Sequence, residues 1–327
     1  QAPSLVLKFI NRLTPECEYV IKSLIALGQG PVIFNALHAD EHLYKRMLQL
    51  LEQLLEIEEF YQHLGGIIGY HLRVIELIVS QQAAESRAIE QTCYIHPEGL
   101  FLGDDNADVR QAVRRGIESI PLIGAIYPLG GAGDRLNLTD QLTGDPLPAA
   151  LLPFLGFTLL DGLIRELQAL EYLYFKLHGE QILTPIAIMT SVEKNNHLQI
   201  IRLCEKRKWF GRPSSSFYLF TQPVVPVITI EGNWSLAAPL TLTLKPCGHG
   251  VLWKLAEDQG VLNWLESHGR QHCLIRQINN PVGGIDHSLL GLLGIGSHDH
   301  KDFGFLSCER LLNSEEGTDV LIETQNG

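Results

Sequence analysis

Apolar residues recur at a helical period through the first third of the chain. Within residues 43–61 they fall three or four positions apart, a spacing that predicts an amphipathic helix. A glycine-containing stretch, residues 64–69, separates this run from a second apolar run at residues 71–80, so we expect a hairpin of two packed helices. The pattern predicts a helical N-terminal region over residues 1–118.

From residue 119 onward, short apolar runs alternate with stretches of helical period. This alternation predicts an α/β domain over residues 119–327. We expect its strands at residues 122–129, 184–190, 217–221, 224–230, 273–278, 304–308 and 318–323. We expect its helices at residues 158–174, 196–206, 250–260 and 262–268. Because the last of these strands ends close to residue 327, we expect further sequence downstream in the natural protein.

Composition narrows the class of protein. The formal net charge of −12 argues against a nucleic-acid-binding surface. The most apolar long run, residues 65–79, contains His71, Arg73 and Glu76, so we expect a soluble globular protein without a membrane span. The 6 cysteines are widely spaced, which favours a reducing compartment. The chain begins at Gln1 rather than at a methionine, and we expect a processed or truncated N-terminus.

The first expected strand of the α/β domain runs directly into a glycine-rich loop. Gly130, Gly131 and Gly133 follow the apolar run, and Arg135 comes next. Glycines let the backbone turn sharply and bring bare N–H groups against an anion, and an arginine can clamp two phosphate oxygens. The motif fits a phosphate loop, although the same glycine pattern also serves ordinary tight turns.

Polar residues close the next two expected strands. Residues 189–191, with Asn195 and Asn196 shortly after them, fit either a ligand site or a helix cap. Gln222 ends the strand at 217–221, and its amide can pair with a nucleobase edge or can simply belong to a turn. Carboxyl ends of neighbouring parallel strands meet at one edge of a sheet, so these residues are expected on the same rim as the glycine loop.

Two further clusters fit the same rim. In residues 245–250, Lys245 precedes Gly248, His249 and Gly250 at the start of an expected helix, where anions are favoured, although the histidine can also act as a cap. Residues 276–280 end another strand with several amides, which we interpret as partners for ligand hydroxyls.

Two histidine-containing runs resemble metal sites only superficially. Residues 38–42 are better explained as a helix cap with acidic residues at a helix start, and residues 297–302 as a solvated hairpin loop. No serine or cysteine nucleophile lies in a recognisable elbow, which argues against covalent hydrolysis.

Five segments, taken in order, carry a resemblance to a known family. Leu-Gly-Gly-Ala-Gly-Asp-Arg-Leu at 129–136 is joined by segments at 188–191, 220–222, 245–250 and 277–280. Together they resemble the UDP-sugar pyrophosphorylase family over about residues 122–323. Within it the chain is most similar to the plastid branch of UDP-glucose pyrophosphorylases that serves sulfolipid synthesis.

The resemblance implies a fold and a reaction. The expected fold is a Rossmann-like, GT-A-like nucleotidyltransferase with a mixed sheet and flanking helices, preceded by the helical region. The expected reaction is uridylyl transfer, in which glucose 1-phosphate attacks the α-phosphorus of UTP and UDP-glucose and pyrophosphate form. The expected cofactor is Mg²⁺ and the expected location is the plastid stroma; the oligomeric state is not implied.

The resemblance also implies roles for individual residues. Phosphate contacts are expected from Gly130, Gly131 and Gly133. The uracil is expected to be framed by Met189, Gln222 and Gly248, with His249 beside a phosphate. Gln277 and Asn279 are expected near the α-phosphate and the metal, and Asn280 next to the sugar. Arg135 is expected near the leaving pyrophosphate, and Lys245 as a second catalytic cation.

Two positions depart from the family pattern. Ala149 occupies a place where many members have a lysine, and Asn279 a place where a carboxylate that binds magnesium is usual. Lys245, Arg135 or Arg276 are candidates to replace the lysine, and Asp286 is a candidate metal ligand. The departures motivate an alternative from another class, a nucleotide-sugar-binding or assembly subunit without catalysis. A helical scaffold built on residues 1–118 is a third reading.

Overall fold

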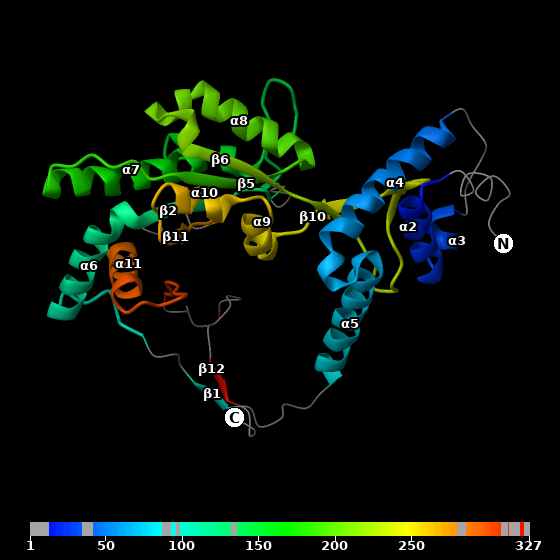
Figure 1. The fold of residues 1–327 in the computed structure, drawn as a ribbon, viewed down its shortest axis with the longest axis horizontal. Helices are drawn as coiled ribbons and strands as arrows, with labels where there is room; N and C mark the ends of the chain where they lie inside the picture. Colours follow the sequence, from blue (N-terminus) through cyan, green and yellow to red (C-terminus); the bar gives the residue numbers. More distant parts are fainter. Residues whose placement is uncertain are drawn as a thin grey trace. The chain divides into compact units, whose positions relative to one another are not determined.

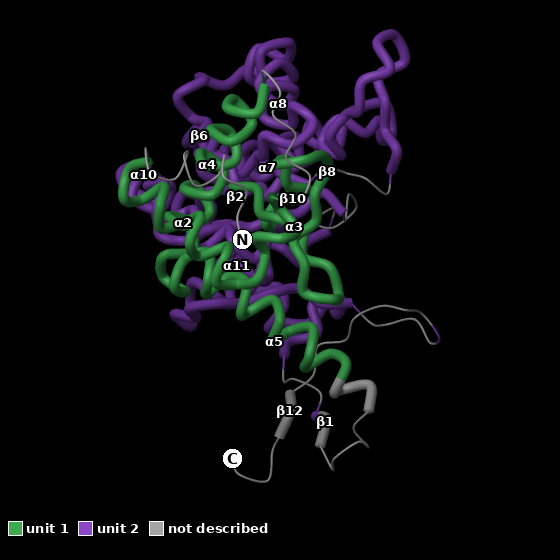
Figure 2. Tube along the Cα trace, turned by 90° about the vertical axis from the view of Figure 1, so that its right-hand side faces the viewer, with its two compact units in different colours: residues 1–88, 223–247 green, residues 89–222, 248–327 purple. Residues whose placement is uncertain are grey.

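The computed structural model describes residues 13–34, 42–86, 93–95, 99–131, 136–279, 286–308, 313 and 321–323. The chain divides into two compact units, shown in different colours in Figure 2. The first unit contains residues 1–88 and 223–247, and the second contains residues 89–222 and 248–327. The two predicted regions divide the chain elsewhere, since they group residues 89–118 with the N-terminal helices and residues 223–247 with the α/β domain.

Helices dominate the first unit (Figure 1). Its longer described helices are α2 (Pro15–Ala26), α3 (Gly30–Phe34), α4 (Leu43–Phe60) and α5 (Gly66–Ser86). Helix α4 buries one stripe of apolar side chains, as its spacing predicted: Met47, Leu50, Leu51, Leu54 and Ile57. Helix α5 begins before the expected residue 71, because a carboxylate oxygen of Glu58 accepts the N–H of Ile67 at 2.7 Å and caps its first turn.

Residues 223–247 belong to the first unit because Trp234 anchors them to its helices. Its indole is 1% exposed, and Nε1 donates to Nδ1 of His71 at 3.0 Å, while its backbone N–H donates to Oε1 of Gln29 at 3.0 Å. The segment contains two antiparallel pairs, β7 (Val224–Pro226) with β10 (Leu244–Pro246) and β8 (Leu236–Ala238) with β9 (Thr241–Leu242). The strand expected at 224–230 is therefore present only in its first part.

Four described strands of the second unit form a parallel sheet in the order β11-β2-β5-β6. Their bounds are β11 (His272–Ile275), β2 (Ile123–Pro128), β5 (Ile186–Ser191) and β6 (Phe217–Gln222). Every residue of β2 and of β5 is buried, as expected for central strands covered on both faces. The predicted α/β class is confirmed, and antiparallel pairing among the described residues occurs outside this sheet, in separate two-stranded sheets and two isolated bridges.

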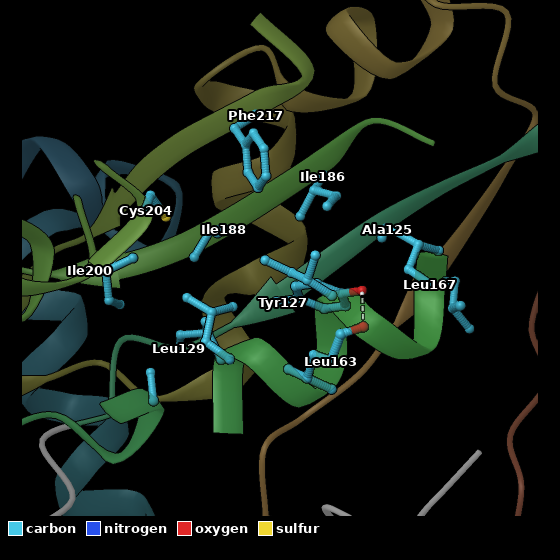
Figure 3. Packing of buried hydrophobic residues seen from close by; sticks show 14 of the residues in the cluster. Ala125, Tyr127, Leu129, Leu163, Leu167, Ile186, Ile188, Ile200, Cys204 and Phe217 are labelled. Atoms are coloured by element: carbon cyan, nitrogen blue, oxygen red, sulfur yellow. Dashed lines mark hydrogen bonds between the residues drawn. The ribbon is translucent and has the colours of Figure 1, made fainter. Parts of the chain in front are cut away.

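Alternate residues of β2 face opposite layers of helices. Tyr127 and Leu129 pack in one apolar cluster with Leu163 of α7 (Leu159–His178) and Ile200 of α8 (Asn196–Lys206), as Figure 3 shows. On the other face, a Cβ added at Gly124 would lie 2.5 Å from the Leu265 side chain of α10 (Val261–Ser267). Helix α9 (Leu252–Asp258) precedes α10. Layers on both faces leave the strand ends as the natural place for a ligand.

Helix ends in this unit carry recognisable signals. Thr158 and Asp161 form a capping box at the start of α7, and Gly179, at φ 72°, ends the helix in the left-handed conformation.

Helices α6 (Ala107–Ser119) and α11 (Ser288–His298) cross so closely that a side chain at Gly116 would clash with the Leu290 carbonyl. The loop expected at residues 297–302 starts inside α11, whose last residue is His298.

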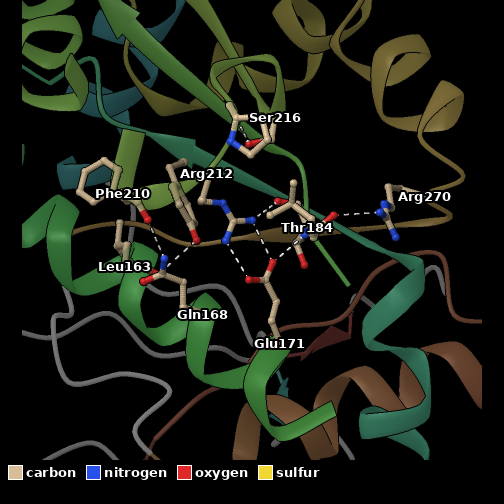
Figure 4. Close-up of polar contacts among 11 residues, drawn as sticks. Leu163, Gln168, Glu171, Thr184, Phe210, Arg212, Ser216 and Arg270 are labelled. Atoms are coloured by element: carbon tan, nitrogen blue, oxygen red, sulfur yellow. Dashed lines mark hydrogen bonds and ion pairs between the residues drawn. The ribbon is translucent and has the colours of Figure 1, made fainter. Parts of the chain in front are cut away.

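A buried ion pair joins α7 to the start of β5 (Figure 4). Arg212 donates to the two carboxylate oxygens of Glu171 at 2.8 and 2.9 Å and to the Thr184 carbonyl at 2.6 Å. The N–H of Thr184 donates back to Glu171 at 2.6 Å. Both terminal nitrogens of Arg212 are used in these bonds, while its Nε is buried without a partner among the described residues. The bonds hold Thr184, which lies just before β5, to α7.

The two expected strands nearest the C-terminus have different outcomes. The strand predicted at residues 304–308 is wrong, because these residues form no strand and all are exposed. Strand β12 (Leu321–Glu323) lies inside the run predicted at 318–323 and pairs antiparallel with β1 (Cys93–Ile95); residues 318–320 lie outside the described residues.

Candidate functional site

The carboxyl ends of β2, β5 and β6 bring three of the predicted motifs together. In the sheet register Pro128 lies opposite Met189, and Ser191 lies opposite Gln222. The N–H of Leu129 donates to the Met189 carbonyl at 2.8 Å, so the glycine loop leaves the sheet beside the end of β5. The common rim predicted from the strand order is therefore present in the second unit.

Gln222 connects the glycine loop with the glycine-histidine motif. Its side chain is 2% exposed, and Oε1 accepts the backbone N–H of Gly248 at 3.0 Å. Its Nε2 is buried and has no hydrogen-bond partner among the described residues. An added Cβ at Gly130 would collide with this Nε2 and would lie 2.8 Å from the Thr190 carbonyl oxygen. Gly130 is thus required for close packing against the amide.

The backbone of Gly248 also requires glycine, for a different reason. Its φ of 93° lies in a region that L side chains rarely adopt, although nothing lies within 4 Å of an added Cβ. Gly131 differs from both residues: it is half-buried, its φ is not in that region, and an added Cβ there would also meet nothing within 4 Å. The fold alone therefore leaves residue 131 open to substitution.

Asn196 ties two strand ends to each other. Its side chain is 1% exposed; Nδ2 donates to the Leu129 carbonyl at 2.9 Å, and Oδ1 accepts the Ser191 N–H at 3.0 Å. Sequence reasoning offered a helix cap or a ligand contact here and missed this role. The Leu129 partner lies 67 residues away in the chain, so only the polar character of Asn196 pointed to the rim.

A second tie joins β5 to β6. The hydroxyl of Thr190 donates to the Phe220 carbonyl at 3.1 Å and lies 2.8 Å from Nδ1 of His197. Met189 and Ser191 on either side are fully buried, and the Ser191 hydroxyl has no partner among the described residues. The end of β5 is thus a rigid platform whose Met189 side chain belongs to the core.

The remaining described candidates are more exposed. His249 begins a short 3₁₀ turn (His249–Val251) that leads into α9, while Gln277 and Asn279 follow β11 at the same edge of the sheet. Lys245 lies on β10 in the first unit, opposite Val225. Gly133, Arg135 and Asn280 lie outside the described residues.

Two of the residues proposed as substitutes for missing family groups, Arg276 and Asp286, have partners of their own. Nη1 of Arg276 lies 3.0 Å from a carboxylate oxygen of Glu166 on α7. Burial raises the pKa of Glu166, and Arg276 opposes that rise. Oδ1 of Asp286 accepts the N–H of Ser288 at 2.9 Å, and hydrogen bonds from Ser288 lower the pKa of Asp286. Ala149 begins a short 3₁₀ turn (Ala149–Leu151).

The described residues do not form a magnesium cage. They contain no group of three or more histidine, cysteine or acidic side chains that could hold a metal ion. Near the candidate rim, the described side chains at 277 and 279 are neutral amides, and Asp286 accepts the N–H of Ser288, the first residue of α11. Mg²⁺ prefers carboxylates together with substrate phosphates, so these residues alone do not fit a resident ion.

Two open hollows in the described surface are lined by none of the candidate residues. One, of about 520 Å³, is lined by residues of α2 and α4, and the other, of about 570 Å³, by α6 and the end of α7. No described helix is long and apolar enough to span a membrane.

The family model and the most similar relative reported below carry the same description. A family model described as UTP–glucose-1-phosphate uridylyltransferase matches residues 156–326. The chain is 48% identical over 294 residues to UTP–glucose-1-phosphate uridylyltransferase 3, chloroplastic, of Arabidopsis thaliana, a match covering 86% of this chain and 33% of that protein. It is 26% identical over 241 residues to UDP-N-acetylhexosamine pyrophosphorylase-like protein 1 of Xenopus tropicalis, covering 71% and 44%. The chain thus spans less than half the length of these two relatives.

Solved structures share the fold. The uridine diphosphate N-acetylglucosamine pyrophosphorylase of Trypanosoma brucei aligns with a TM-score of 0.60 at 15% identity, over 88% of this chain and 56% of that one. A putative UDP-N-acetylglucosamine pyrophosphorylase of Entamoeba histolytica aligns with a TM-score of 0.53 at 21% identity, over 63% and 50%. The predicted nucleotidyltransferase fold is confirmed.

Proposed function

Because the chain belongs to the UTP–glucose-1-phosphate uridylyltransferase family, we propose that it carries the nucleotide site of an enzyme forming UDP-glucose and pyrophosphate from UTP and glucose 1-phosphate. The observation that supports this most directly is the arrangement of Gln222 between Gly130 and Gly248. It places an amide donor and an acceptor beside a glycine loop at the carboxyl ends of parallel strands.

Uracil recognition follows from the chemistry of the Gln222 amide. A buried donor without a partner costs about 1–3 kcal/mol, and Nε2 is such a donor among the described residues. A uracil carbonyl oxygen supplies the missing acceptor. The Oε1 atom holds the Gly248 N–H with one lone pair and can accept the uracil N3–H with the other. A cytosine lacks that N–H, so the same geometry disfavours it.

Phosphoryl chemistry requires positioning and charge neutralisation more than a covalent partner. An oxygen of the sugar phosphate forms a bond to the α-phosphorus as the bond to the bridging oxygen of the β-phosphate breaks, and pyrophosphate carries away that electron pair. Gly131 offers a backbone N–H that a phosphate can approach without a side chain in the way. Gln277 and Asn279 present exposed amides at the same edge.

Other roles rest on the family resemblance. They are His249 beside a phosphate, Gly133 in the phosphate loop, Asn280 near the sugar, and Arg135 and Lys245 as catalytic cations. Mg²⁺ is expected to reach the site on the phosphates of UTP, since the described residues offer no carboxylate cluster. A plastid location and a place in sulfolipid synthesis are part of the same proposal; the chloroplastic designation of the Arabidopsis relative supports the location.

The activity is tested by pyrophosphate release from the purified chain. Release should require UTP, glucose 1-phosphate and Mg²⁺ together, and CTP should be a poor substitute for UTP. Gln222→Leu removes both the donor and the acceptor and should weaken UTP binding measured by calorimetry. Absence of release with every sugar phosphate and metal tried would contradict the proposed reaction.

A nucleotide-sugar-binding subunit without catalysis is the second candidate. Position 149, where many family members have a lysine, is an alanine. Arg276, one of the cations named as a replacement, is already paired with Glu166. Tight UDP-glucose binding by calorimetry, without turnover under the same conditions, would favour this second function over the first.

A further inference from the structure

The segment that follows β11 is held to the sheet by a charged anchor. The N–H of Arg276 donates to the Ile126 carbonyl at 3.2 Å, which extends the pairing of β11 with β2 by one step. Its guanidinium lies 3.0 Å from the Glu166 carboxylate on α7. The two side chains are only 15% and 22% exposed, so the pair is shielded from solvent more than an ordinary surface ion pair.

Exposure alternates along this segment. Arg276 and Ile278 are partly buried, and Ile278 packs against the apolar cluster that includes α7 residues. Gln277 and Asn279 are exposed. Two side chains thus hold the segment to the α7 layer of the second unit, while the two amides between and after them remain available to a ligand.

We propose that Glu166 is a positioning residue: by holding Arg276, it fixes the direction in which Gln277 and Asn279 present their amides to the α-phosphate of UTP. This role rests on the proposed function and adds to it a residue of α7. Glu166 contacts the segment through Arg276, at 3.0 Å, and is not itself one of the residues expected to contact the ligand. Its contribution is therefore to alignment, because a displacement of about 1 Å in a reacting group can lower a rate by about 100-fold.

Asp161 supplies a matched control on the same helix. Its carboxylate is 6% exposed and lies 2.8 Å from Nη2 of Arg207, and it caps the start of α7 through Thr158. Asp161→Asn therefore weakens an ion pair of α7 that does not hold the segment after β11, although the Arg207 side chain is 41% exposed. A purely structural effect of losing charge on α7 would appear in both variants.

The test compares Glu166→Gln, Glu166→Asp and Asp161→Asn with the unaltered chain. Glu166→Gln should lower kcat by about 10- to 100-fold with little change in the KM for UTP. It should also speed hydrogen exchange at the amides of residues 276–279. Glu166→Asp keeps the charge and should recover part of the rate. Asp161→Asn should lower the melting temperature without either effect.

The outcomes distinguish failure of the positioning role of Glu166 from failure of the proposed reaction. Pyrophosphate release that is unchanged in Glu166→Gln, or equally reduced in Asp161→Asn, overturns the positioning role and leaves the proposed reaction standing. If the unaltered chain binds UDP-glucose without turnover, the proposed reaction fails, and the role then requires about 10-fold weaker UDP-glucose binding in Glu166→Gln alone. If the unaltered chain neither turns over nor binds UDP-glucose, both are overturned.

Discussion

The side-chain oxygen of Gln222 accepts the backbone N–H of Gly248 at 3.0 Å, and this bond joins two motifs that lie 26 residues apart in the chain. It holds the Gln222 amide in one orientation, with Nε2 directed toward Gly130. Three glycines at this rim consequently have different physical requirements, and substitution can separate them.

Gly130→Ala and Gly131→Ala should behave differently. An alanine at 130 would place its methyl group against Gln222 and the Thr190 carbonyl, so we expect destabilisation of about 1–3 kcal/mol. An alanine at 131 would meet nothing within 4 Å, so the melting temperature should hardly change while UTP binding weakens. Thermal unfolding and calorimetry on both variants test this; equal stability losses would show that residue 131 is also a packing position.

Gly248→Ala should destabilise the chain through its backbone alone. The φ of 93° with ψ of −179° is strained for any L side chain, and we expect a loss of about 1–3 kcal/mol. Gly250→Ala is the matched control, because φ at Gly250 is not in the positive region and an added Cβ there also meets open space. Denaturant unfolding of the two variants measures the difference; a Gly248→Ala chain as stable as Gly250→Ala would contradict the strain argument.

Arg212→Met should be among the most destabilising single changes in the second unit. It leaves the Glu171 carboxylate buried and uncompensated, which costs about 3–5 kcal/mol when one member of a buried pair is removed. The double variant Arg212→Met, Glu171→Leu should be more stable than Arg212→Met alone, because the stranded charge is gone. Urea unfolding of the single and double variants tests the coupling; additive losses would argue against it.

His71 should make the stability of the first unit depend on pH. Burial lowers the pKa of His71, and Nδ1 must be unprotonated to accept the Trp234 N–H. A lowered folded-state pKa gives stability that is fully present above the unfolded value of about 6.5 and is lost as pH falls through the folded-state pKa. The loss should be smaller in His71→Gln. Unfolding followed by tryptophan fluorescence between pH 8 and pH 5, at about one-unit steps, provides the measurement.

Local patterns were sufficient for the core elements. The apolar run at 122–129 and the helical period at 43–61 predict β2 and α4 closely, because each pattern reflects how the element itself is buried. The run at 304–308 has a similar strand pattern, but none of the described strands pairs with it, and pairing is a long-range property. A local pattern cannot supply that partner.

The site was predictable as a rim but not as a set of contacts. Strand order placed residues 130, 189 and 222 at one edge, since parallel strands end together. The contacts of Asn196 with Leu129 and of Arg276 with Glu166 bring together residues far apart in sequence, and no residue spacing announces them. The roles of the individual candidates stay predictions until a ligand is measured.

The chain leaves the second unit after Gln222 and returns to it at Gly248. A hydrogen bond joins these two residues, so the segment 223–247 begins and ends at the same place in the second unit. Residues 223–247 therefore have the geometry of an insertion into that unit. The second unit is in this sense one module built from two stretches of chain. The first stretch ends at Gln222, the residue proposed to bind the uracil.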